Sequence, residues 1–581
     1  MAATGRAALV HFALRQLDAA AEMALPPASQ PGAPDAATAA LGRLLQRCAA
    51  LLESSDGALT EEMGGRAAQV ALAKALRERC VSHGARLGTT FNSASGLKTL
   101  ADDSSRRLQR VASMATSSGS AADAVDADSE RAAQACEPPL DAMCALLRGV
   151  IQFDVYLKGR IEGGSGDGGG ARGIGAGGSA NRAEGESLRH SAPFSEMARS
   201  TVSLGHFWTL AAVSRAVRTA ASSEATAVHV SDGDEVGGGD GTTSGLAEKV
   251  DSAFYVLQTS LRRAAHTCDG GIASAAVKHG AALLQRVVLA QLQGQLKQSL
   301  SSKLAGAMAG AALAGAQNLT QKITSSAAEG AMAEVTGRLA DASRTPLGLL
   351  HTLSALDLCI SYAPRLWRQA EEDFGRSLPP QALGATRAQL AEAESVTKLF
   401  EGAFDSGLRQ LSSALFPRLN ARLDAVRTAS YTLQTEAAYA AAEGDTFVAG
   451  LMAELENVML PLSPGLAEGA REALLQILIQ SCADALEKLL FTKRFDQLGA
   501  LQLDRDVRAL AKRLGELTNR SVRERIARLT QMCTLLNLET EAESIELWSE
   551  GGWKLTSTEA KQTLALRIEF RTDAINKLPL S

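Results

Sequence analysis

Histidine and cysteine are the side chains best suited to chemistry near neutral pH, and this sequence spreads eight of each widely along its length. Neither type forms the close cluster that a metal ion requires, and there is no Cys-x-x-Cys pair. The pattern predicts isolated helical histidines and reduced, buried thiols in a cytosolic protein. The histidines are His11, His83, His190, His206, His229, His266, His279 and His351. The cysteines are Cys48, Cys80, Cys136, Cys144, Cys268, Cys359, Cys482 and Cys533.

The dinucleotide-binding pattern Gly-x-Gly-x-x-Gly has matches beginning at Gly164, Gly168 and Gly173. It binds pyrophosphate only between a strand and a helix N-terminus, whereas these matches lie in glycine-rich low-complexity sequence, so we interpret them as chance. Carboxylate runs such as Glu371 to Asp373 are typical of a solvated helix face, although an acid–base pair stays open. The sequence therefore predicts no catalytic residue, no metal and no cofactor, and a protein that is not an enzyme.

One arginine has neighbours that make its environment unusual. Arg528 shares a helical face with Met532 and Leu535, so burial of that face would desolvate a guanidinium, which then needs a partner. Our hypothesis is that Glu559 supplies this partner across a helix–helix contact. In the alternative, which spacing alone favours, Arg528 extends to solvent and Glu559 serves only as a helix cap.

The segment Thr556-Ser557-Thr558-Glu559 is a helix start signal. The Thr556 hydroxyl and the Glu559 carboxylate can each accept a hydrogen bond from a free backbone N–H of the first turn. The sequence predicts a capped helix from Glu559 to about Phe570.

Helical spacing dominates the chain, and the alternating runs typical of strands are almost absent. We predict an all-α fold, with one apolar stripe at Leu498, Leu501, Leu510, Leu514 and Leu517 and another at Val522, Ile526, Leu529, Cys533 and Leu536. Three segments rich in small and polar residues are predicted to be flexible insertions between helices. They are Gly159 to Gly185, Ser222 to Gly245 and, more mildly, Ser113 to Ser129.

A chain of 581 residues is too long for one hydrophobic core, because single cores stop growing at roughly 250–300 residues. We predict an elongated rod of consecutive helical bundles with Gly/Ser-rich disordered insertions. The predicted parts are a bundle at 1–157, which begins inside a larger domain, a flexible insertion at 158–187, a bundle at 188–345 with a flexible insertion at 222–245, a bundle at 346–490, and a small C-terminal helical domain at 491–581.

The charge pattern argues against nucleic acid as a partner, since the net charge is −5 and no long run of one sign occurs. No segment reaches the roughly 20 apolar residues of a membrane-spanning helix. The nearest, Leu304 to Leu319, is mostly Ala and Gly, and we interpret its Gly306–Gly310 pair as close helix packing in a soluble chain. The first residues lack the layout of a signal peptide, and Asp18 and Glu22 argue against a transit peptide.

Three C-terminal passages carry a resemblance to a known family. They are RFDQLGALQLDRDVRALAKRL (Arg494 to Leu514), SVRERIARLTQMCTLLNLE (Ser521 to Glu539) and TSTEAKQTLALRIEFRTDAI (Thr556 to Ile575). Their order and spacing, with Trp548 and Trp553 between them, resemble the end of subunit 4 of the conserved oligomeric Golgi complex. The passage KVDSAFYVLQTSLRRA (Lys249 to Ala264) is similar to the middle region of that family.

The resemblance implies a helical rod that acts as a subunit of a vesicle-tethering complex, peripheral on the cytosolic face of the Golgi membrane, in retrograde intra-Golgi transport. It implies the other subunits of that complex as partners, together with SNARE proteins and their regulators. It also implies a pair matching Arg528 and Glu559 that orients the last small helical domain. This implication strengthens the pairing hypothesis.

The chief departure from the family is at the N-terminus. The family carries a long coiled-coil region there that joins other subunits and contacts SNARE machinery, whereas this chain is expected to begin after it, as an N-terminally truncated member. Two alternatives stay open: a subunit of another multisubunit tethering complex, or a generic helical scaffold. An alternative function of a different class is that of a helical enzyme. Metal or nucleotide retained on purification would favour that alternative.

Overall fold

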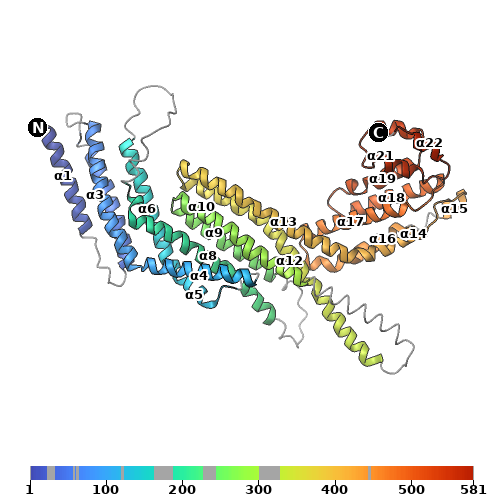
Figure 1. The fold of residues 1–581 in the computed structure, drawn as a ribbon, viewed down its shortest axis with the longest axis horizontal. Coiled ribbons are helices and arrows are strands. Elements are labelled where there is room, and N and C mark those ends of the chain that lie inside the picture. Colours follow the sequence, from blue (N-terminus) through green and yellow to red (C-terminus); the bar gives the residue numbers. More distant parts are fainter. Residues whose placement is uncertain are drawn as a thin grey trace. The chain divides into compact units, whose positions relative to one another are not determined.

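The structure is a computed structural model, and it describes most of the chain. The described residues are 2–22, 33–56, 59, 65–118, 124–162, 187–226, 244–299, 328–441 and 447–579. Within these ranges the regular elements are helices and no strand occurs, which confirms the predicted all-α class (Figure 1). Contacts divide the chain into two compact units, Met1–Gln293 with Cys359–Leu399, and Gly294–Leu358 with Phe400–Ser581. The finer five-part division and the rod shape stay predictions.

The first unit is built from amphipathic helices around α8, which packs against α3, α4, α5, α6, α9 and α10. The largest side chains of this unit, among them Phe194, Phe207 and Trp367, are almost completely buried. Its elements are α1 (Ala2–Glu22), α2 (Ala33–Asp56), α3 (Gly65–Ala94), α4 (Leu97–Ser118), α5 (Ala127–Ala135), α6 (Glu137–Glu162), η3 (Leu188–His190), α8 (Ala192–Thr226), α9 (Ser244–His266), α10 (Gly270–Leu283) and η4 (Leu284–Leu289), with parts of α12 (Ala328–Ser377) and α13 (Pro380–Arg422).

The second unit contains the remaining parts of α12 and α13 and the C-terminal helices. Helix α19 is central, because it packs against α17, α18 and α21. The elements are α14 (Asp424–Thr428), α15 (Glu436–Ala441), α16 (Phe447–Met459), η5 (Leu460–Gly465), α17 (Glu468–Leu490), α18 (Gln497–Leu517), α19 (Arg523–Leu536), α20 (Glu543–Ser549), α21 (Ser557–Leu564) and α22 (Thr572–Lys577).

The C-terminal stripes differ in outcome. Every residue of the stripe from Val522 to Leu536 is buried, as predicted. On α18 the prediction was partly wrong, because Leu501 is 44% exposed and Leu517 is 36% exposed. The buried face of α18 instead runs through Ala500, Leu503, Val507, Leu510 and Leu514, whose small and β-branched members the leucine spacing overlooked.

Two local predictions need correction. The segment Ser113 to Ser129 is helical at both ends, since α4 runs to Ser118 and α5 begins at Ala127, where Asp126 accepts a hydrogen bond from the Ser129 N–H. The last predicted helix is shorter than expected, since α21 ends at Leu564 and not near Phe570. The backbone beyond it pairs with Phe495, whose N–H donates to the Leu566 carbonyl at 3.0 Å.

The predicted glycine-rich insertions fall mostly outside the described residues, as do the three Gly-x-Gly-x-x-Gly matches and the Gly306–Gly310 pair. At their borders, α6 extends to Glu162 and α8 to Thr226, a few residues past the predicted starts at 158 and 222.

A short backbone crossing holds the start of α18. Phe495 forms isolated parallel bridges with Tyr431 and Arg567, and the Asp496 N–H donates to the Tyr431 carbonyl at 3.1 Å. The Asp496 side chain caps α18 by accepting from the Gly499 N–H at 2.7 Å. This crossing brings the Tyr431 carbonyl against Gly499 so closely that a Cβ there would lie 1.8 Å from its oxygen.

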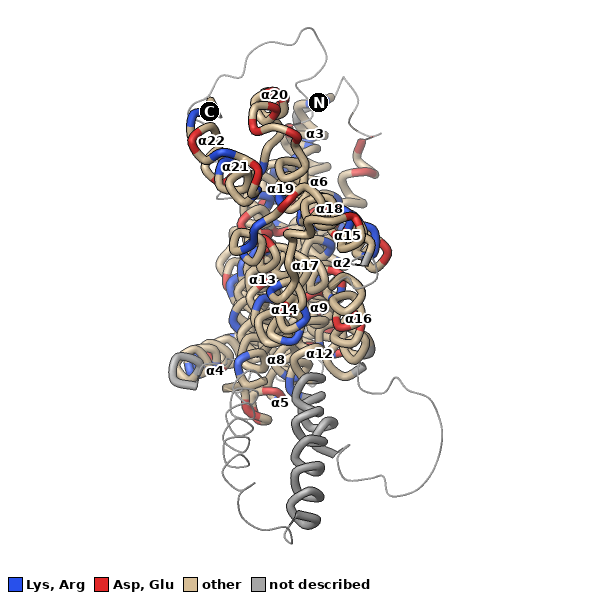
Figure 2. The backbone as a smooth tube through the Cα atoms, turned by 90° about the vertical axis from the view of Figure 1, so that its right-hand side faces the viewer, with Lys and Arg blue, Asp and Glu red and all other residues tan. Residues whose placement is uncertain are grey.

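The described helices carry both signs of charge along their length, as Figure 2 shows. No helix among the described residues is long and apolar enough to cross a membrane.

Candidate functional site

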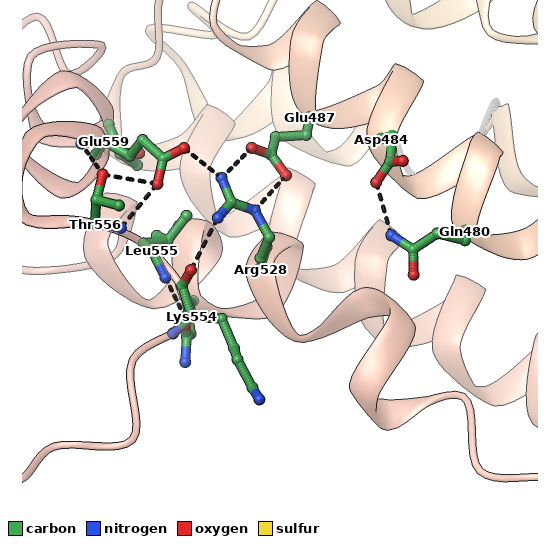
Figure 3. A network of polar contacts seen from close by, with 10 residues as sticks. Gln480, Asp484, Glu487, Arg528, Lys554, Leu555, Thr556 and Glu559 are labelled. Atoms are coloured by element: carbon green, nitrogen blue, oxygen red, sulfur yellow. Dashed lines mark hydrogen bonds and ion pairs between the residues drawn. The ribbon is translucent and has the colours of Figure 1, made fainter.

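The structure brings Arg528 and Glu559 together and adds a second carboxylate. Arg528 lies on α19, directly above Met532 and Leu535, which are both fully buried. Its side chain is 31% exposed, so the guanidinium is partly removed from water. Figure 3 shows it between Glu487, from α17, and Glu559, at the start of α21.

All three nitrogens of the guanidinium donate hydrogen bonds. Arg528 Nε and Nη2 donate to Glu487 Oε2 and Oε1 at 2.9 and 2.6 Å, which is the two-point geometry that arginine forms with carboxylates. Nη2 also donates to Glu559 Oε1 at 2.7 Å, and Nη1 donates to the Lys554 carbonyl at 2.8 Å. One arginine therefore joins α17, α19, α21 and the segment that precedes α21.

Glu559 is at once an ion-pair partner and a cap. Its Oε2 accepts from the Thr556 N–H at 2.8 Å and from the Thr556 hydroxyl at 2.9 Å, while the Glu559 N–H donates to Thr556 Oγ1 at 3.3 Å. These contacts form the reciprocal capping box that the sequence predicts. Glu559 therefore pairs through one carboxylate oxygen and caps through the other, unlike the alternative in which Arg528 extends to solvent and Glu559 only caps the helix.

The electrostatics of the cluster favour its charged form. The hydrogen bonds that Arg528 donates to Glu487 and then to Glu559 raise its pKa above the ordinary value. The hydrogen bond from Arg528, followed by that from the Thr556 backbone, lowers the pKa of Glu559 to about 2 from 4.5. Since the folded-state pKa is depressed, this stabilisation is present above pH 4.5 and is lost as the pH falls toward about 2.

Sequence reasoning missed Glu487. It lies 41 residues before Arg528 and becomes its neighbour only because α17 packs against α19. No spacing rule links the two positions, so no local signal in the sequence could have identified it.

The turn before α21 positions the Lys554 carbonyl. Gly551 and Gly552 have φ of +78° and +79°, a left-handed conformation that favours glycine. The ring of Trp553 stacks on Trp548 with centroids 5.2 Å apart, and its Nε1 donates to the Leu547 carbonyl at 3.0 Å. The two tryptophans therefore fix the turn that presents Lys554.

Most of the other candidate groups remain dispersed, but two histidines predicted to be isolated are in contact. In the described ranges no three His, Cys, Asp or Glu side chains are placed to hold a metal ion. The eight cysteines are buried and free, as predicted. His206 and His279 stack with ring centroids 3.9 Å apart, and burial, with the neighbouring His279, lowers the pKa of His206 to about 4.

Asp506 on α18 is a buried acid in the same unit. It is 2% exposed, and its Oδ1 has no hydrogen-bond partner in the described part of the chain. Burial raises its pKa to about 6 from 3.8, although the Arg505 charge opposes the rise. The folded state therefore holds the proton more tightly, and the resulting stabilisation is complete below pH 3.8 and lost as the pH rises through about 6.

Replacing Asp506 should increase stability at neutral pH. For Asp506→Asn we expect the free energy of unfolding to rise by about 2 kcal/mol above pH 7, and the gain to shrink as the pH falls toward 5. Urea denaturation of parent and variant between about pH 5 and 8 measures this difference. Asp504→Asn, which removes an ion pair with Arg508 on the same helix, is the control and should give no gain. Identical pH profiles for the parent and Asp506→Asn would contradict the assignment.

Comparison with known proteins shows that the C-terminal helices are similar to a known family. Residues 349–562 match the family model described as Conserved oligomeric Golgi complex subunit 4, C-terminal. This range contains Glu487, Arg528 and Glu559.

Relatives from distant organisms carry the same description. The chain is 32% identical to Conserved oligomeric Golgi complex subunit 4 of Arabidopsis thaliana over 57% of this chain and 42% of that protein. It is 30% identical to that of Drosophila melanogaster over the same shares. It is 29% identical to that of Homo sapiens over 40% of this chain and 31% of that protein. The chain thus spans less than half the length of these relatives.

A similar solved structure is the C-terminal domain of the exocyst subunit Sec6p, with a TM-score of 0.42 and 12% identity over 65% of this chain and 89% of that one. The family-model match and the relatives from Arabidopsis thaliana, Drosophila melanogaster and Homo sapiens thus make this chain similar, over part of its length, to the conserved oligomeric Golgi complex subunit 4 family.

Proposed function

We propose that the chain is a structural subunit of a Golgi vesicle-tethering complex and works in retrograde intra-Golgi transport through protein–protein contacts. The observation that carries this proposal is the family match over residues 349–562, which covers the helices around Arg528. A tether needs length and docking surfaces, and packed helices provide both without a reacting group. A subunit of another tethering complex and a generic helical scaffold are the competing functions.

The proposed partners are the other subunits of the conserved oligomeric Golgi complex, at the cytosolic face of the Golgi membrane. SNARE proteins and their regulators are proposed as further partners of the assembled complex.

We further propose that the Arg528 cluster orients the small C-terminal helical domain. The support is geometric: the guanidinium contacts Glu487 on α17, at one side of the predicted domain boundary, and Glu559 on α21, at the other. A charged contact with two-point geometry fixes direction as well as distance.

Complex assembly tests the main proposal. The chain, with an affinity tag, is expressed in cells depleted of their own subunit 4, and the co-purified proteins are identified by mass spectrometry. We expect the other subunits of the conserved oligomeric Golgi complex to be recovered in defined ratio. The same purification shows whether SNARE proteins are recovered with them. Recovery of exocyst subunits in their place would support the first alternative, and a chain purified alone would contradict the proposal. Small-angle X-ray scattering of the purified chain measures the predicted elongation.

A further inference from the structure

A groove in the second unit is lined by more cations than carboxylates. It has a volume of about 600 Å³ and lies between α13, α14 and α17. Three of its lining side chains are the cations Arg409, Arg427 and Lys488, against one carboxylate, Asp484. The whole chain carries a net charge of −5, whereas the side chains that line this groove have more cations than carboxylates.

The cations of the groove are available to a ligand. The side chains of Arg409 and Arg427 are 74% and 57% exposed, and each pairs only with a carboxylate on its own helix, Asp405 at 3.9 Å and Asp424 at 2.7 Å. Exposed pairs of this kind contribute little and exchange readily. Lys488 is exposed and has no carboxylate within ion-pair distance among the residues that the structure describes. Asp484, the opposing charge, already accepts a hydrogen bond from Gln480 Nε2 at 2.7 Å.

The groove also has apolar walls. Phe416 from α13 and Ile477 from α17 line it and are half-buried. Half-buried apolar side chains beneath a polar rim are the arrangement in which amphipathic helices dock, with apolar anchors in the groove and charges at its edge.

We propose that this groove binds an acidic amphipathic helix of a partner protein, with apolar residues against Phe416 and Ile477 and carboxylates against Arg409, Arg427 and Lys488. Charge complementarity favours this occupant, because a basic segment would face three like charges and a purely apolar one would make no use of the Lys488 ammonium and the exposed, exchangeable arginines. The inference extends the proposed function by assigning a docking surface and the chemistry of its partner. It does not depend on which complex the chain enters.

A pair of designed peptides probes the groove directly. The first is a fluorescent helical peptide of about 18 residues with Leu at spacings of three and four and Glu elsewhere, and the second has Lys in place of every Glu. Binding to the whole chain is measured by fluorescence anisotropy at low and physiological salt. We expect the Glu peptide to bind, to weaken with salt, and to bind at least tenfold more tightly than the Lys peptide.

Matched charge reversals locate the binding. Arg409→Glu with Lys488→Glu should weaken Glu-peptide binding by about tenfold or more, whereas Lys512→Glu with Arg513→Glu on α18 makes the same charge change outside the groove and should leave it within about twofold. If the first pair unfolds, as thermal melting would show, Lys488→Ala and Phe416→Ser serve in its place. The proposal would be overturned if both charge-reversal variants lost the same affinity for the Glu peptide, or if the Glu and Lys peptides bound equally well.

Vesicles and complex assembly separate the remaining outcomes. Vesicles containing about 30% phosphatidylserine test whether the groove binds a lipid surface. If the chain bound these vesicles but not the Glu peptide, and the groove reversals abolished vesicle binding, the ligand would be a membrane and the proposal would be overturned. Analytical ultracentrifugation of parent and variants measures whether the groove binds a second copy of the chain. A dimer that the groove reversals abolish would also overturn the proposal. Failure of peptide binding with intact recovery of the Golgi complex would reject the groove and leave the proposed function in place.

Discussion

Gly499→Ala should strongly destabilise the C-terminal helices. A Cβ at this position would lie 1.8 Å from the Tyr431 carbonyl oxygen, 2.6 Å from its carbon and 3.0 Å from its Cα. These atoms belong to a backbone that the Asp496 N–H and the Phe495 bridge hold in place, so they cannot move aside as a side chain would. We expect a loss of about 3 kcal/mol or more in the free energy of unfolding, at the upper end for overpacking. Urea denaturation followed by circular dichroism measures it.

The same helix provides the control. Gly515 on α18 is exposed, and a Cβ there would meet nothing within 4 Å. Gly515→Ala should therefore stabilise the protein by about 0.5–1 kcal/mol, because alanine is the better helix former. A Gly499→Ala variant as stable as the parent would mean that α18 does not approach Tyr431 as the structure has it.

Removing the Arg528 guanidinium should have the second large effect. Arg528→Met keeps the apolar stem but leaves Glu487, which is 15% exposed, and Glu559 without their shared cation. Breaking a fully buried pair costs about 3–5 kcal/mol, and partial exposure here reduces the expected loss to about 2–3 kcal/mol. Arg528→Lys should fall between parent and Arg528→Met, since an ammonium cannot make the two-point contact. Arg523→Met, on the exposed side of α19, is the matched control and should change stability by less than about 0.5 kcal/mol.

Double-mutant cycles distinguish the energy of the Arg528 ion pairs from a general loss of stability. Arg528→Met combined with Glu559→Gln, and separately with Glu487→Gln, should each show a coupling energy of about 1 kcal/mol or more. The coupling with Glu559 should fade at low pH, where that carboxylate takes up its proton. Additive losses in both cycles would mean that the guanidinium stabilises neither carboxylate.

Much of the helical architecture follows from periodicity alone. The stripe from Val522 to Leu536 is predicted correctly because a helix with one buried face repeats its apolar residues every three or four positions. The stripe on α18 is misplaced because Ala500 and Val507 carry part of its buried face, and a search for leucine passes over them. The end of α21 is missed for another reason, since the pairing of Leu566 with Phe495 joins positions far apart in sequence.

The cluster around Arg528 shows where local reasoning stops. The capping box at Thr556 is readable because its residues are three positions apart. The contact with Glu559 is a hypothesis from sequence, because an arginine above Met532 and Leu535 requires some partner but does not name it. The contact with Glu487 cannot be predicted from the sequence, because only the packing of α17 against α19 brings Glu487 to Arg528.

The two oxygens of Glu559 tie the formation of a helix to the docking of that helix. With only eight residues, α21 is too short to persist on its own, and its first turn is held by the same carboxylate that contacts α19 through Arg528. Loss of the interhelical contact should therefore fray the turn as well, so that the segment detaches and melts in one step. The amide protons of Thr556 and Glu559 then act as built-in reporters, whose exchange with deuterium is slow only while the arginine is engaged.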